Sequence, residues 1–380
     1  MMLIKDKPPF DALCADNPFI LMTGPLTGCG MDATARWSVC SKSPLTGFFS
    51  ESYSGGKTPD AIDATGFDAI VIQGRCDEPA VLTVHPEGVD FHSAGDLWGK
   101  ETYGVEDAIN ERFGREQYRK KGALVIGPAS ENLVRFGCIK NDYWRSAGRT
   151  GAGTVMGSKK IKGILFTGNR KRSQADEAAV KVFSKNFMAE FNDHAAANAY
   201  RTLGTPMLVK MTNTAGAFPN RYWTKGTMDN WENISAEALI DKMDPTPHAC
   251  GKCFMACGQL GTVKEGRHAG LKIEGPEYET IAGCGSNLGI FDPFTIVEMN
   301  FYCDAYGLDT ISVGTSVAFA MECFESGWID TTHTNGLDLS FGNRLSALTL
   351  IHQMAAGDGF GSIIGQGVRN MKSIFADRFG

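Results

Sequence analysis

Three cysteines within eight residues constrain this chain more than any other feature. Cys250, Cys253 and Cys257 form a C-x2-C-x3-C pattern in the segment that begins at His248. Thiolates select zinc, copper(I) or iron–sulfur clusters, so we expect one short loop to turn all three sulfurs toward one centre. A [4Fe–4S] cluster usually takes four thiolates. The fourth would come from elsewhere in the fold or from sequence outside this chain.

Length and composition narrow the class of protein. The chain has 380 residues, of which 43% are hydrophobic and 21% charged, as expected of a soluble globular protein with two domains. Its net charge is −6 and its 37 Lys and Arg residues are scattered, which gives no nucleic-acid footprint. No apolar run reaches the roughly 18 residues of a membrane span. The start, Met1–Pro9, lacks the apolar core of a secretory signal.

The eleven cysteines are an odd number spread irregularly along the chain, which favours a reducing compartment with metal-bound and free thiols. We therefore expect a cytoplasmic protein. Six cysteines stand alone among small or apolar neighbours and are predicted to be buried structural thiols. They are Cys14, Cys29, Cys40, Cys76, Cys138 and Cys323.

The hydrophobic pattern divides the chain near the polar segment Asn169–Gln174. Before it, short apolar or alternating runs predict strands at 19–23, 37–41, 67–73, 80–85, 124–127 and 163–167, with one clear helix at 105–113. After it, a helical period predicts helices at 175–194, 206–214, 236–242, 276–285, 294–306, 311–326 and 345–355. The sequence therefore predicts an α+β protein with a β-rich domain (1–168) and a helical domain (169–380).

Glycine-rich loops punctuate the first half, at Thr23–Gly30, Lys42–Gly47, Tyr53–Gly56 and Arg145–Gly153. Such loops can bring backbone N–H groups and guanidinium groups to a phosphate, or can be ordinary tight turns. Gly151–Lys159 is neither a dinucleotide loop nor a P-loop, because no apolar strand leads into it and the Lys-Ser order is inverted.

Two segments of the second half carry carboxylates. Glu277 can be a helix-start acid, whereas Glu279 lies further in and can serve in proton transfer or simply favour the helix. Asp304 and Asp309 flank a helix-ending Gly307, either as a cofactor loop or as a C-cap followed by a turn.

Short segments distributed over the whole chain occur in the same order as in one known family. They are 24–28, 34–38, 42–48, 54–56, 66–71, 127–132, 145–149, 155–159, the three cysteines, 274–279 and 304–312. Together they resemble the tungsten-containing aldehyde:ferredoxin oxidoreductase family. The resemblance implies a saddle of two β-sheets, clipped at its N-terminus relative to the family, followed by a helical domain. It also implies that a third family domain is absent. That domain supplies the fourth cluster cysteine, a second pterin loop and a histidine near the metal, so we expect these residues alone to be inactive.

The resemblance further implies a bis-pterin cofactor of tungsten or molybdenum. The residues that match its binding loops are Arg36, Tyr53, Ser54, Gly55, Arg145, Ser146, Gly148, Arg149, Asp304, Leu308 and Asp309. The backbone carbonyls of Tyr53 and Ser146 match ligands of a Mg ion; Tyr53 replaces a smaller amide, but only its carbonyl is needed. Cys250, Cys253 and Cys257 match the ligands of a [4Fe–4S] cluster. Glu279 matches a glutamate beside the metal and is the predicted catalytic residue.

Some family dimers bridge their subunits through an iron held by an E-x-x-H segment and a later His. Here Phe301 occupies the third position after Glu298, and Leu348 stands in place of the later His. We therefore predict no bridging metal, while a homodimer remains possible.

The expected function is oxidation of an aldehyde to a carboxylate, with electrons passing through the cluster to ferredoxin or an iron–sulfur subunit. The alternative within the family is the catalytic subunit of a tungsten-dependent benzoyl-CoA reductase, which would take an acyl-CoA substrate. An alternative of another class is a non-enzymatic module with structural zinc, although closed zinc sites prefer four near-tetrahedral ligands.

Overall fold

The computed structural model describes residues 10–379, which fall into two compact units. Unit 1 contains the chain up to His194 together with Ala249–Phe254 and Asp304–Leu308, and unit 2 contains the remainder. The predicted lack of a secretory signal at Met1–Pro9 lies outside the described residues. The predicted domain boundary at residue 168 stays a prediction.

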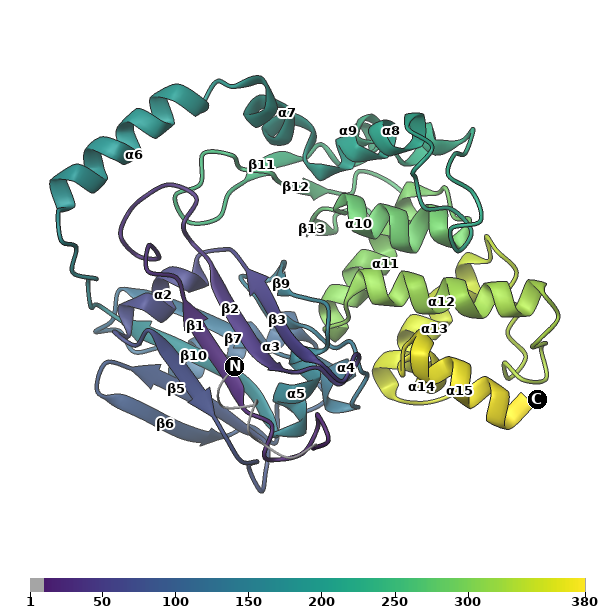
Figure 1. Ribbon diagram of the computed structural model, residues 1–380, viewed down its shortest axis with the longest axis horizontal. Coiled ribbons are helices and arrows are strands. Elements are labelled where there is room, and N and C mark those ends of the chain that lie inside the picture. The colour runs from purple at the N-terminus through teal and green to yellow at the C-terminus, as the bar shows by residue number, and fades with distance from the viewer. Residues whose placement is uncertain (1–9, 380) are drawn as a thin grey trace. The chain divides into compact units, whose positions relative to one another are not determined.

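Unit 1 contains two sheets (Figure 1). The first has the order β3-β2-β1-β4 and is antiparallel throughout; its strands are Phe19–Thr23 (β1), Trp37–Lys42 (β2), Phe49–Ser54 (β3) and Ala69–Ile72 (β4). The second has the order β6-β5-β10-β7-β8-β9, with only β10 and β5 parallel among its pairs. Its strands are Ala80–His85 (β5), Gly88–Ser93 (β6), Lys120–Val125 (β7), Ile139–Asn141 (β8), Arg145–Ala147 (β9) and Ile161–Gly168 (β10).

The central strand β10 is buried on both faces because its side chains alternate between two cores. Ile164 and Phe166 join a cluster with Phe19 and Trp37 of the first sheet, whereas Leu165 packs into a second cluster beneath α3. The helices of unit 1 are Thr58–Ala64 (α2), Thr102–Phe113 (α3), Pro128–Glu131 (α4), Ala152–Ser158 (α5) and Glu177–Phe191 (α6). The two sheets thus share one core, and α3 covers the other face of the second sheet.

Unit 2 is mainly helical. Its helices are Ala195–Leu203 (α7), Leu208–Thr214 (α8), Ala236–Met243 (α9), Tyr278–Thr280 (α10), Pro293–Tyr306 (α11, whose last residues belong to unit 1), Thr310–Glu325 (α12), Arg344–Ala356 (α13), Gly361–Ile364 (α14) and Val368–Phe379 (α15). Shorter 3-10 or π turns occupy Thr205–Met207, Trp231–Ile234, Ile281–Gly285 and Ser286–Leu288. A small antiparallel sheet contains Thr246–His248 (β11), Gly258–Thr262 (β12) and Lys272–Glu274 (β13). Among residues 10–379, no helix combines the length and apolarity that crossing a membrane requires.

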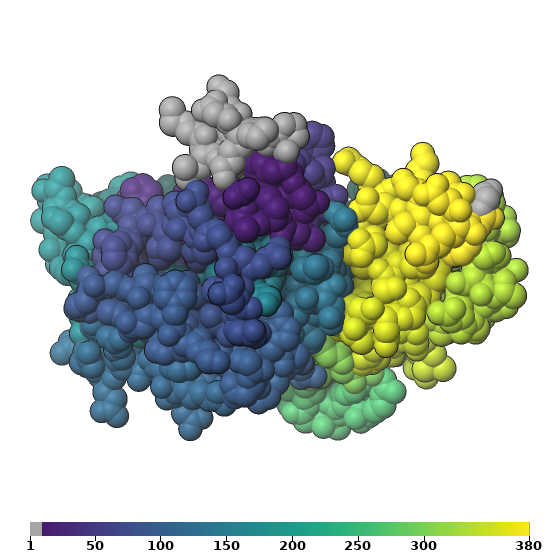
Figure 2. Space-filling model, turned by 90° about the horizontal axis from the view of Figure 1, so that it is seen from below, coloured from purple at the N-terminus to yellow at the C-terminus, as the bar shows by residue number. Residues whose placement is uncertain are grey.

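Most predicted elements are present, including β1 and β5 at their predicted bounds, but the strands β3, β6, β8, β9, β11, β12 and β13 were not predicted. In β3 the buried side chains are Ser50, Ser52 and Ser54, and in β6 the apolar Val89 and Phe91 are exposed. Both strands therefore invert the apolar-inside pattern on which the prediction rests. Figure 2 shows the blue surface of unit 1, to which the exposed residues of β6 contribute.

The prediction for the isolated cysteines is confirmed for three of six. Cys40, Cys138 and Cys323 are buried. Cys14, Cys29 and Cys76 are partly exposed, because they lie in turns and loops outside the strands and helices. For these three the predicted burial was wrong.

A buried carboxylate makes unit 1 sensitive to pH. Glu106 on α3 is 6% exposed, and its Oε2 accepts a hydrogen bond from the Tyr143 backbone N–H at 3.0 Å. Burial, reinforced by the nearby charge of Asp142, raises the pKa of Glu106 to about 7. The folded state therefore binds more protons than the unfolded state between the ordinary glutamate pKa and about 7, so stability falls as pH rises through that window.

We expect Glu106→Gln to raise the free energy of unfolding by about 2–3 kcal/mol at about pH 8, and to have little effect at about pH 4, where both states are protonated. Urea unfolding at the two pH values measures this difference. Glu111→Gln, on the exposed side of the same helix, should change little at either pH. A Glu106→Gln protein no more stable than the wild type at about pH 8 would contradict the assignment.

Candidate functional site

The first half of the cysteine loop is fixed to unit 1 by three contacts. The Arg36 Nη1 donates to the Cys250 Sγ at 3.5 Å. The Gly251 N–H donates to the Gly56 carbonyl at 2.9 Å, and the Ala33 N–H donates to the Lys252 carbonyl at 3.1 Å. The loop therefore lies against the glycine-rich loop Tyr53–Gly56 and against residues 33–36, which precede β2.

Gly55 is the residue that permits this approach. A Cβ at this position would lie 2.4 Å from the Arg36 Nη1 and 2.6 Å from the Cys250 Sγ, closer than real Cβ atoms come. A side chain at 55 would displace the guanidinium group, the sulfur or both. The structure thus brings together Arg36, Gly55 and Cys250, three residues predicted for two different cofactors.

The remaining cysteines are placed separately. Cys253 belongs to unit 1 and Cys257 to unit 2, immediately before β12. The segment that carries them lies between the strands β11 and β12, which the sequence did not predict. No group of three or more His, Cys, Asp and Glu side chains within residues 10–379 is arranged to hold a metal ion. A cluster on all three cysteines stays a prediction.

The two predicted cofactor loops of the β-rich half are joined by serines of β3. The Ser52 hydroxyl donates to the Gly148 carbonyl at 2.5 Å, and the Ser50 and Thr150 hydroxyls lie 2.9 Å apart. These bonds explain why the inward face of β3 is polar. Of the predicted residues here, Tyr53 and Arg149 are exposed, Ser54 is buried, and Arg145, Ser146 and Gly148 are partly buried.

Lys140, which sequence reasoning missed, joins the second of these loops to the predicted pterin loop after α11. The side chain is fully buried, and its Nζ lies 2.5 Å from the Asp304 Oδ1 and 2.6 Å from the Ser146 Oγ. A buried ammonium group is tolerated only with such partners. Backbone contacts also hold the predicted pterin loop. The Cys138 N–H donates to the Gly307 carbonyl at 2.8 Å, and Gly137 and Leu308 form an isolated antiparallel β-bridge.

Asn141 and Asp142, which follow Lys140, hold the loop that contains Gly55. The Asn141 amide donates to the Gly55 carbonyl at 2.9 Å, and its Oδ1 accepts from the Ser54 hydroxyl at 2.8 Å and from the Trp37 indole at 3.3 Å. The Asp142 Oδ2 accepts the backbone N–H groups of Lys57 at 2.7 Å and Thr58 at 3.0 Å. The carboxylate thereby caps the first turn of α2.

We call Lys140, Asn141 and Asp142 the β8 anchor. One short polar run at the end of β8 thus contacts the segment 54–58, Ser146 of β9 and Asp304, which are distant from one another in sequence. In the sequence, the β8 anchor is visible only as three consecutive polar residues between apolar runs. An exposed turn would give the same pattern. Only the fold shows that Lys140 and Asn141 are both fully buried.

Unit 2 carries the other predicted residues. Glu279 is exposed on the short helix α10. Glu277 precedes that helix and accepts a hydrogen bond from the Thr205 hydroxyl, whose oxygen in turn accepts the Tyr278 N–H at 2.9 Å. Asp309 is buried and caps α12, because its Oδ2 accepts the Ser312 N–H at 3.0 Å. Glu298 on α11 is paired with Arg267 and lies 3.1 Å from the His268 Nε2.

Comparison with known families decides the identity of the fold. A family model described as the N-terminal domain of aldehyde ferredoxin oxidoreductase matches residues 1–168, and a model of domains 2 and 3 matches residues 182–378. The chain belongs to the aldehyde ferredoxin oxidoreductase family. The expected α+β fold, with a sheet-rich first part and a helical second part, is confirmed.

Individual relatives agree with this family. The chain is 36% identical to a tungsten-containing aldehyde ferredoxin oxidoreductase of Pyrococcus abyssi over 96% of its own length and 60% of the relative's. It is 30% identical to an aliphatic sulfonate oxidoreductase, WOR-like subunit, of Pyrococcus furiosus, over 94% of its length and 58% of the relative's. The chain therefore spans about three-fifths of the length of these relatives.

A solved structure also shares the fold. It is the active site complex of benzoyl coenzyme A reductase in complex with 1,5-dienoyl-CoA, with a TM-score of 0.83 and 22% sequence identity. The likeness covers 98% of this chain and 57% of that one. At this identity it supports the family fold and nothing finer.

The close approach of Arg36 and Cys250 at Gly55 can be tested by substitution. Gly55→Ala should push Arg36 and Cys250 apart and weaken retention of iron at the cysteine loop by about tenfold or more, as loss of supporting contacts around a metal site typically does. Iron per chain, measured against increasing chelator after anaerobic purification, reports the change, with far-UV circular dichroism as the check on folding.

Gly95→Ala is the matched control, since nothing lies within 4 Å of a Cβ at that exposed position. Equal retention of iron by both variants would show that the close approach at Gly55 has no part in holding the cysteine loop.

Proposed function

We propose that this chain forms part of an oxidoreductase that converts an aldehyde and water into a carboxylate, three protons and two electrons. The observation that carries the proposal is the direct contact of Arg36, Gly55 and Cys250 in unit 1, because it joins a loop predicted for a phosphate-bearing cofactor to a loop predicted for an iron–sulfur cluster. Family membership and the names of the relatives support it.

The residues present fit the cofactors of such an enzyme. Arg36 and Arg149 offer exposed guanidinium groups, which suit phosphate groups of a pterin. The absence of a Cβ at Gly55 lets the Arg36 guanidinium meet the Cys250 sulfur, and this guanidinium suits the negative charge of cluster thiolates. These features favour a bis-pterin tungsten or molybdenum cofactor next to a [4Fe–4S] cluster.

The holding residues we propose follow the predicted loops. We propose that the pterin cofactor would be bound by Arg36, Tyr53, Ser54, Gly55, Arg145, Ser146, Gly148, Arg149, Asp304, Leu308 and Asp309. A Mg ion would be bound by the backbone carbonyls of Tyr53 and Ser146. Cys250, Cys253 and Cys257 would bind the cluster. The cofactor supplies the two-electron chemistry when bound. The chain's own part is to orient it through the β8 anchor, and to accept a proton at the Glu279 carboxylate.

The electrons would leave to ferredoxin or to an iron–sulfur subunit. The runner-up within the family, reduction of an aromatic acyl-CoA, uses the same holding residues and differs in its substrate. A structural zinc module would use the cysteines alone and leave the arginines and the β8 anchor without a role.

Elemental analysis and an assay on the same sample test the proposal. We expect the protein, purified anaerobically from its native host, to contain about four iron atoms and about one tungsten or molybdenum atom per chain. It should reduce oxidised benzyl viologen when an aldehyde is the electron donor, and it should not oxidise reduced viologen when benzoyl-CoA is the electron acceptor. One equivalent of zinc with neither iron nor tungsten would establish the zinc module. Turnover of an aromatic acyl-CoA without aldehyde oxidation would establish the runner-up.

A further inference from the structure

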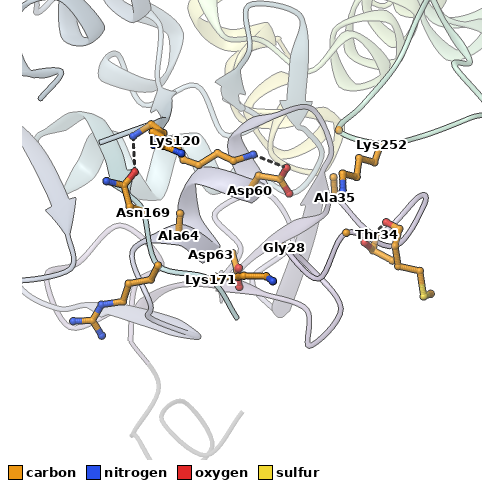
Figure 3. A pocket seen from close by; sticks show the side chains of 15 residues that line it. Gly28, Thr34, Ala35, Asp60, Asp63, Ala64, Lys120, Asn169, Lys171 and Lys252 are labelled. Carbon is orange, nitrogen blue, oxygen red and sulfur yellow. Dashed lines mark hydrogen bonds and ion pairs between the residues drawn. The ribbon is translucent and has the colours of Figure 1, made fainter. Parts of the chain in front are cut away.

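A cationic hollow in unit 1 lies beside the cysteine loop and has no role in the proposed cofactor site. It is a cavity of ≈ 490 Å³ formed by the loop between β1 and β2, by α2, by the chain before β7 and after β10, and by Gly251 and Lys252. Figure 3 shows Lys252 beside Ala35 and Thr34, with Lys120 and Asn169 across the hollow.

Cations outnumber carboxylates around this hollow. Its lining includes the exposed side chains of Arg119, Lys120, Arg170, Lys171 and Lys252, against only Asp60 and Asp63. The chain as a whole carries a net charge of −6. A local excess of positive charge on an acidic chain is therefore a feature of this surface and not of the composition.

The two carboxylates are already neutralised by ion pairs. The Asp60 Oδ2 lies 3.3 Å from the Lys120 Nζ. The Asp63 Oδ1 lies 2.6 Å from the Nη2 of Arg172, a residue that does not line the hollow. Lys171 is paired with the exposed Glu177 at 2.8 Å.

Three cations remain to confer the positive charge. None of the ion pairs within residues 10–379 involves Arg119, Arg170 or Lys252. The only side-chain hydrogen bond of Arg170 in that range runs to the Pro86 carbonyl, at 3.0 Å. These three charges face solvent and are available to an anionic partner.

The hollow is joined covalently to the predicted cluster ligands. Lys252 stands between Cys250 and Cys253, and Gly251 lines the hollow while its N–H is bonded to Gly56. Electron transfer slows steeply with distance, so an electron carrier must bind close to the cluster. A carrier bound at this hollow would contact the cysteine loop at the exposed Lys252.

We infer that this hollow and its rim of cations form the docking surface for a small acidic electron-carrier protein. The inference rests on the proposed function, since it assumes that electrons leave through the cysteine loop. All five cations are exposed and extend from three separate segments, which suits the salt-sensitive steering of a charged protein surface. A tight site for a small phosphate would instead be expected to bury its cations and pair them with the anion.

The test is a pair of charge-reversal proteins. Arg119→Glu/Arg170→Glu changes two cations of the hollow that touch no predicted cofactor residue. Lys210→Glu/Lys372→Glu makes the same change of net charge at exposed positions of α8 and α15 in unit 2. The anaerobic holoenzyme is assayed with an acidic ferredoxin and, separately, with benzyl viologen; binding of oxidised ferredoxin is measured in parallel without turnover.

We expect the hollow variant to raise the KM and the Kd for ferredoxin by about tenfold at low salt, with the difference fading at about 0.5 M salt, because exposed charges are screened. The viologen rate should be unchanged, and the control variant should resemble the wild type in every assay.

Equal ferredoxin binding by the hollow variant and the wild type would overturn the inference. So would saturable binding of inorganic pyrophosphate that is lost in the hollow variant while ferredoxin binding persists, because this would identify a small-anion site. A wild type that binds ferredoxin through the hollow yet reduces neither ferredoxin nor viologen would uphold the docking surface and reject the proposed function.

Discussion

The buried hydrogen bonds of the β8 anchor are the constraint on which the site depends. Lys140 satisfies polar groups of Ser146 and Asp304. Asn141 and Asp142 both satisfy the segment 54–58, which contains the Gly55 carbonyl and the first turn of α2. Because a buried polar group without a partner is costly, the loops can hardly shift one at a time. The Gly56 carbonyl then holds Gly251, so the position of the cysteine loop follows from an anchor more than a hundred residues away in sequence.

How far the sequence could predict this arrangement depends on what each element buries. The apolar strands β1 and β5 were predicted at their bounds because their side chains enter the core. Strand β3 was missed because its inward residues are serines, which bond to Gly148 and Thr150 and not to an apolar core. The β8 anchor was missed for the same reason. Arg36 and Gly55 were predicted from the family resemblance alone; no local pattern shows that they would meet Cys250.

Family membership explains the architecture without fixing the substrate. The relatives in the comparison are named for aldehydes and for an aliphatic sulfonate, at 36% and 30% identity. The contacts described in unit 1 mostly join side chains to backbone groups of other loops, and they fix the loops that we propose as the cofactor site. Such a framework can serve several reactions, because the chemistry of this family belongs largely to its cofactor.

Amide hydrogen exchange tests the anchor most directly, since it needs neither cofactor nor turnover. In Asn141→Ala, the Gly55 carbonyl and the Ser54 hydroxyl lose their partner, and loss of such a bond costs about 1–3 kcal/mol. We predict that the Gly251 amide, two contacts away, exchanges about tenfold faster or more, while β1 and β10 keep their protection. Asn230→Ala, at an exposed position whose side chain makes no capping hydrogen bond to the turn that follows it, should leave Gly251 unchanged. Unaltered exchange at Gly251 in Asn141→Ala would contradict the claim that the β8 anchor positions the cysteine loop.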